Sequence, residues 1–62
     1  MWLDLTLNDD TVISVNMDQI VSFKRSGTGT VLYTAGTGDT INVREAPDII
    51  AARLRNQLDQ RR

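Results

Sequence analysis

Apolar residues recur at helical spacing in only one segment, residues 46–60, and this places a single helix near the end of the chain. Ile50, Leu54 and Leu58 stand four residues apart, so they share one face of a helix. Pro47 suits the first turn, where its missing N–H would have no partner in any case. The spacing therefore predicts an amphipathic helix over residues 46–60, whose apolar face closes the core of a small domain.

The rest of the chain alternates apolar and polar residues with a period of two, which is typical of strands with one buried face. Short polar or glycine-containing segments separate these runs and predict turns. Ile20 beside Val21 interrupts the alternation and indicates a bulge or a change of face. The predicted strands are 1–7, 11–15, 20–25, 30–34 and 40–43.

These elements predict a single α+β domain over residues 1–62, a small antiparallel β-meander of about five strands packed by one C-terminal helix. The expected core consists of the residues on the inward phase of each element. They are Leu3, Leu5, Ile13, Val15, Phe23, Ile50 and Leu54.

Size and composition favour self-association. A 62-residue chain buries only about 60% of its unfolded surface, and this chain has no cysteine or histidine for a disulfide or a structural zinc site. One helix, about 10 Å wide, would also cover only half of a flat five-stranded sheet about 20 Å wide. The face opposite the leucines carries Trp2, Val12 and either Tyr33 or Val31. We therefore predict a homodimer or higher oligomer whose interface contains Trp2, Val12 and Tyr33.

Charge and hydropathy exclude several classes of protein. Seven basic and eight acidic residues leave a net charge of −1, which disfavours a sequence-independent grip on nucleic acid or anionic lipid. No apolar run approaches the roughly 20 residues of a membrane span, and the first residues lack the pattern of a signal peptide. These features predict a cytoplasmic protein without membrane insertion.

No recognisable catalytic, cofactor or metal motif is present. The glycine pairs in 27–29 and 36–38 complete neither a dinucleotide-binding fingerprint nor a phosphate loop, so hairpin turns are the expected interpretation. Asp9 and Asp10 are neighbours on a polar turn, with no apolar pocket to raise a pKa. The sequence predicts a protein that is not an enzyme, with no catalytic residue, no cofactor and no metal.

The basic residues allow one alternative, a nucleic-acid-binding module. Its contacts would come from Lys24, Arg25, Arg53 and Arg55, with Arg61 and Arg62 beyond them and Tyr33 or Phe23 available for base stacking. The acidic strand region, with a net charge of −3 over residues 1–43, would repel a polyanion. Arg61 and Arg62 also suit the negative end of the helix dipole.

A family resemblance covers most of the chain. Its residues are Leu3, Leu5-Thr6-Leu7-Asn8, Ile13, Val15-Asn16, Ile20 and Phe23, then a glycine turn, Val43-Arg44-Glu45 and Ile49-Ile50. In this order the chain resembles the small flagellar FlbD-type (SwrD-like) proteins of bacteria, a family without a firmly known biochemical activity. More distantly it resembles half of a LytTR-type DNA-binding β domain, which would imply nucleic-acid binding, but no base-contacting residue can be matched.

Taken together, these features predict a non-enzymatic accessory or adaptor protein, motility- or phage-related, that acts through self-association and through an unknown protein partner. Nucleic-acid binding is the alternative.

Overall fold

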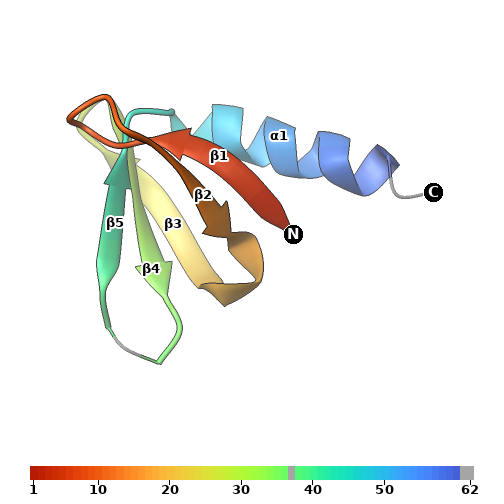
Figure 1. The fold of residues 1–62 in the computed structure, drawn as a ribbon, viewed down its shortest axis with the longest axis horizontal. Helices are drawn as coiled ribbons and strands as arrows, with labels where there is room; N and C mark the ends of the chain where they lie inside the picture. The colour runs from red at the N-terminus through yellow and green to blue at the C-terminus, as the bar shows by residue number, and fades with distance from the viewer. Residues whose placement is uncertain (37, 61–62) are drawn as a thin grey trace.

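The computed structural model describes residues 1–36 and 38–60, with side chains through Leu58. Five antiparallel strands and one helix form it (Figure 1), so the predicted α+β class is confirmed. The observed bounds agree with the predicted ones to within one residue. The elements are β1 (Trp2–Thr6), β2 (Val12–Asn16), β3 (Ile20–Ser26), β4 (Gly29–Thr34), β5 (Thr40–Val43) and α1 (Pro47–Gln60).

The strands are divided between two sheets and do not form one flat layer. β1 pairs with β2, while β3, β4 and β5 form a second sheet in that order. A 3₁₀ turn, Met17–Gln19, separates β2 from β3, and the Asn16 side chain caps it by accepting a hydrogen bond from the Asp18 N–H. The sheets meet through one antiparallel bridge between Leu7 and Val43.

The inner faces of both sheets and one face of α1 share a single core. The buried cluster consists of Leu3, Leu5, Val15, Leu32, Val43 and Ile50. Ile13, Phe23 and Leu54 pack against it but are only partly buried. All seven predicted core residues therefore belong to the core, while the buried Leu32 and Val43 were not predicted.

Folding the strands into two sheets changes how much surface the helix must cover. The inner faces of β1–β2 and β3–β4–β5 contribute to the same core, so part of the apolar surface is covered by the other sheet. A helix narrower than a flat five-stranded sheet is therefore not, by itself, a reason to expect a second chain.

Some sequence predictions fall outside the described residues. These are the contribution of Thr37 to the second glycine turn and the placement of Arg61 and Arg62 beyond the helix end.

Candidate functional site

The outward edge of β1, the edge that does not pair with β2, is covered by residues that follow β5, including side chains of α1. Three β1 carbonyl oxygens on this edge each accept a hydrogen bond. The bonds run from the Arg44 N–H to Thr6 O at 2.7 Å, from Arg53 Nη1 to Asp4 O at 3.1 Å and from Gln57 Nε2 to Trp2 O at 2.8 Å.

The spacing of these contacts has a geometric cause. Arg53 and Gln57 are four residues apart, which is about 6 Å along a helix. Asp4 and Trp2 are two residues apart, which is about 6.8 Å along a strand. A helix that runs antiparallel to β1 can therefore place one side chain at each outward carbonyl. Covering an edge in this way prevents another strand from pairing there.

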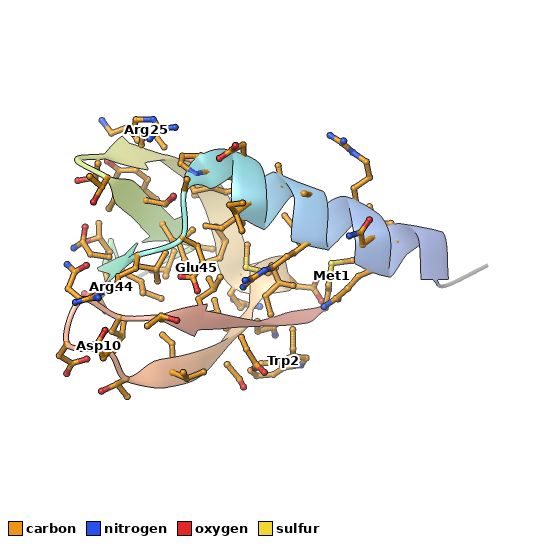
Figure 2. All side chains as sticks on the ribbon, turned by 90° about the horizontal axis from the view of Figure 1, so that it is seen from above. Met1, Trp2, Asp10, Arg25, Arg44 and Glu45 are labelled. Atoms are coloured by element: carbon orange, nitrogen blue, oxygen red, sulfur yellow. The ribbon has the colours of Figure 1, made fainter. Side chains whose placement is uncertain are left out.

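Glu45 closes the remaining part of the same edge, between β1 and α1 (Figure 2). Its carboxylate accepts from the Thr6 N–H at 2.9 and 3.1 Å and from the Thr6 hydroxyl at 3.0 Å. Arg53 Nη1 lies 3.7 Å from it, and the Glu45 side chain is only 12% exposed. Burial raises the pKa of Glu45, but hydrogen bonds and the Arg53 charge lower it more, so the pKa lies below its ordinary value.

Replacing Glu45 with glutamine should destabilise the protein at pH 7 by about 1.5–3 kcal/mol, the usual worth of hydrogen bonds to a charged group. Because the folded-state pKa is lowered, the ionised carboxylate stabilises the fold at neutral pH. That contribution is lost as the pH falls from the ordinary glutamate value of about 4.3 through the lower folded-state pKa. Urea unfolding of both proteins at pH 7 and at pH 3 measures the difference, which should shrink at pH 3.

Asp10→Asn is the control for that experiment. Asp10 also pairs with an arginine, Arg44, at 2.7 Å, but its side chain is 74% exposed. An exposed pair contributes about 0–1 kcal/mol, so this variant should lose less stability than Glu45→Gln at pH 7. Equal losses would show that Glu45 acts only as a surface charge.

The outward edges of β2 and β3 are open within the described part of the chain, where β2 pairs with β1 alone and β3 with β4 alone. β1 and β2 pair in continuous register over their whole length. β3 has a register shift between Ile20 and Ser22, at the place where the sequence predicted a bulge or a change of face. The free edge of β5 is short, because the strand has four residues and its Val43 end meets Leu7.

The predicted interface residues do not form one patch in the isolated chain. Trp2 and Val12 lie on the outer face of the β1–β2 hairpin and are 61% and 65% exposed. They stand at opposite ends of that face, separated by the Asp4–Ser14 pair, in which the Ser14 hydroxyl donates to the Asp4 carboxylate at 2.8 Å. Tyr33 belongs to the other sheet, where Lys24 Nζ lies 5.9 Å from its ring centroid.

The predicted nucleic-acid contacts are also dispersed. Lys24 and Arg25 are neighbours in an extended strand, so their side chains point to opposite faces of the sheet. Arg53 is engaged by Asp4 O and by Glu45, whereas Arg55 is exposed on α1. The structure therefore does not bring these four cations onto a single surface.

A small apolar groove between β3 and α1 was not predicted. It has a volume of about 190 Å³ and is bordered by the open edge of β3. Its apolar lining residues are Met1, Met17, Ile20, Val21, Phe23 and Leu54. The sequence contained one sign of this groove, the break in alternation at Ile20-Val21. An extra residue in a strand is left without a partner on the neighbouring strand, so its side chain can line a groove. Val21 is 67% exposed.

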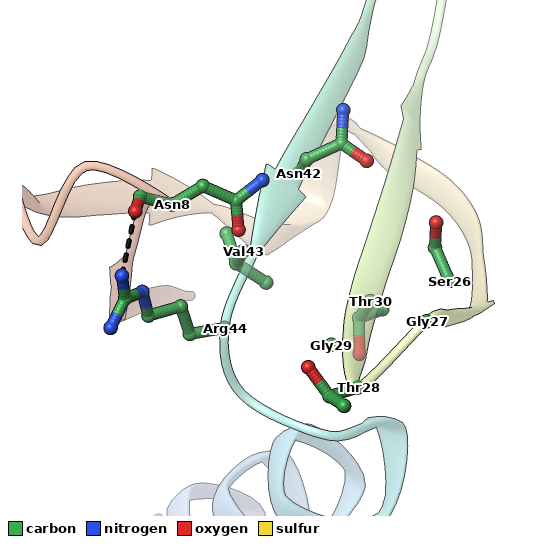
Figure 3. Close-up of a pocket in the computed structure, with 9 residues that line it drawn as sticks. All are labelled: Asn8, Ser26, Gly27, Thr28, Gly29, Thr30, Asn42, Val43 and Arg44. Carbon is green, nitrogen blue, oxygen red and sulfur yellow. Dashed lines mark hydrogen bonds between the residues drawn. The ribbon is translucent and has the colours of Figure 1, made fainter.

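A larger, polar hollow of about 680 Å³ lies where the β3–β4 turn approaches the end of β5 (Figure 3). Its side chains are hydroxyls, amides, the apolar Val43 and one guanidinium, that of Arg44. The Arg44 guanidinium is already bonded to Asn8 O at 2.8 Å and to Asp10. The described lining contains no carboxylate that could act as a general base. The hollow can accept polar groups.

Among residues 1–36 and 38–58, no three histidine, cysteine, aspartate or glutamate side chains are grouped so that they could hold a metal ion. No helix in the described part of the chain is long and apolar enough to cross a membrane.

The chain matches no protein-family model, no curated protein and no solved structure.

Proposed function

We propose that this chain acts without catalysis, by self-association and by binding another protein, as a small accessory or adaptor protein. The observation that supports this function best is an exposed tryptophan beside an open strand edge. Trp2 is 61% exposed on the β1–β2 hairpin, and the outward edge of β2 has no partner in the described chain. Tryptophan is enriched at the centres of protein interfaces, and open strand edges readily pair with other chains.

The proposed setting is a bacterial, cytoplasmic protein with a motility- or phage-related role. The likeness to FlbD-type proteins supports the bacterial and motility-related part of this proposal. The protein partner would bind either the assembled oligomer or the outward edge of β2 that a second copy would otherwise occupy.

Nucleic-acid binding is the second candidate function. Its support is the outer face of the β3–β4–β5 sheet, where the Lys24 ammonium lies over the Tyr33 ring and pairs a cation with a stacking surface. Such binding would weaken steeply as the salt concentration rises, whereas an apolar protein interface would not.

Sedimentation of the wild-type chain over a concentration series tests the proposed function. We expect a dimer or larger species at high micromolar concentration that persists at high salt, because the contacts are apolar and backbone-mediated. Trp2→Ala should shift the equilibrium toward monomer. Leu58→Ala is the matched control, since Leu58 is 56% exposed but lies near the end of α1. A wild type that is monomeric at every concentration would refute self-association.

A further inference from the structure

The strand edges of this protein differ in how well they are protected against pairing with another chain. Natural proteins protect edges with covering helices, bulges, charged side chains or very short strands. The β1 edge is covered by Arg53 and Gln57 of α1. β5 is four residues long and is occupied at one end by Leu7. β3 has both a bulge and two adjacent cations, Lys24 and Arg25.

β2 has none of these protections. Its five residues, Val12–Asn16, include no charge and no proline, and they pair with β1 without a bulge. β1 lies between β2 and α1 (Figure 2), so the helix cannot cover the edge of β2. A regular, uncharged edge of this kind can accept a further strand along its whole length.

We propose that a second copy of this chain binds there, with the two β2 strands antiparallel across a twofold axis at Ser14. This inference rests on the proposed self-association and specifies its site. Leu7 N bonds to Thr11 O, and Met17 N bonds to Met1 O. The backbone N–H and C=O groups of the odd-numbered residues of β2 therefore point toward β1, and those of the even-numbered residues point toward the open edge. Placing Ser14 opposite Ser14 of the second copy pairs every outward-facing residue of both strands, whereas any shifted register pairs fewer.

The side chains support the same register. On the outer face, Val12 would stand opposite Asn16 of the second copy, and Asn16 is itself the β1–β2 partner of Trp2. The exposed Val12 and Trp2, separated within one chain, would thus lie in one row across the axis. On the inner face, the half-buried Ile13 would stand opposite Val15 of the second copy and extend the apolar core surface.

Charge does not oppose this arrangement. The acidic residues nearest the ends of β2 already have cationic partners in their own chain. Asp10 is paired with Arg44 at 2.7 Å, and Asp18 with the amino group of Met1 at 3.1 Å. The Asp4 carboxylates would be three strand spacings apart, about 14 Å, which exceeds the Debye length of about 10 Å at 0.1 M salt.

Two matched valine variants test the site. Val12 and Val21 are 65% and 67% exposed, so lysine at either position leaves the core unchanged, but Val12 lies on β2 and Val21 lies on β3. By sedimentation, Val12→Lys should raise the dimer dissociation constant by about tenfold or more, because a charged lysine on an edge strand opposes its pairing with another strand. Val21→Lys should leave it within about twofold of the wild-type value. The opposite order would place the interface at the groove beside β3.

Isotope-filtered NOE spectra of the unmodified protein test the register. In a mixture of labelled and unlabelled chains, intermolecular cross-peaks should join Val12 to Asn16 and Ile13 to Val15. A wild type that self-associates but gives intermolecular cross-peaks only from other residues overturns this inference and leaves the proposed function standing. A wild type that stays monomeric overturns both.

Discussion

Replacing Ile50 with alanine should lower the free energy of unfolding by about 2–5 kcal/mol. Ile50 is fully buried where α1 meets both sheets, and it packs in one cluster with Leu5, Leu32 and Val43. Truncation removes its contacts and leaves a cavity that the two sheets cannot both move to fill. In a domain of this size each kcal/mol corresponds to about 4–8 °C, so the melting temperature should fall by at least about 8 °C.

Ile49 provides the control, because it has the same chemistry at the neighbouring position of the same helix but is 44% exposed. Ile49→Ala should cost no more than about 1 kcal/mol. Circular dichroism melts of the two variants compare them directly. Equal losses would mean that α1 does not dock through the face that carries Ile50.

Replacing Gly29 with alanine should have a comparable or larger effect, about 3 kcal/mol or more. A Cβ on Gly29 would run into the carbonyl oxygen of Val43, closer than side chains are ever found, and that oxygen belongs to the backbone of β5. To relieve the clash, β5 must move away from β4 at the Thr30–Val43 pair. The same movement would strain the hydrogen bond from the buried Thr30 hydroxyl to Glu45 O, which is 2.7 Å long.

Gly27 separates this effect from the ordinary cost of losing a glycine. It is the first central residue of the β3–β4 turn, with a φ of 60°, and a Cβ there would contact nothing within 4 Å. Gly27→Ala should therefore lower the free energy of unfolding by only about 1–2 kcal/mol, the cost of placing a residue with a Cβ at positive φ. Thermal unfolding should rank Gly29→Ala as the less stable variant. If Gly27→Ala melts lower, the approach of Val43 is not what requires glycine at position 29.

The two glycines show what local sequence can and cannot predict. A turn at residues 27–29 follows from composition, and Gly27 occupies it with the expected positive φ. The requirement at Gly29 comes from a strand that begins eleven residues later, at Thr40, so no local pattern could reveal it. Leu32 was left out of the predicted core, although placing Tyr33 or Val31 on the outer face puts Leu32, which alternates with both, on the inner face.

The candidate site also has parts that the sequence could predict and parts that it could not. Periodicity placed Trp2 and Val12 on the outer face, and both are exposed there. Sequence could not show that β2 and β3 leave open edges, because which edges meet depends on contacts between distant segments. Arg53 was a candidate nucleic-acid contact as one of several basic residues on the helix, yet its guanidinium donates a hydrogen bond to Asp4 O.

The covering of β1 by α1 also has a consequence for the order of events during synthesis. Its contacts join Asp4 to Arg53 and Trp2 to Gln57, residues about fifty positions apart in the chain. Chains grow from the N-terminus at about 5–20 residues per second, so β1 emerges seconds before the side chains that cover its edge. During that interval the β1 carbonyls of a nascent chain lack the hydrogen-bond donors that α1 later supplies. A chaperone or a neighbouring nascent copy could bind to this edge before the helix is synthesised.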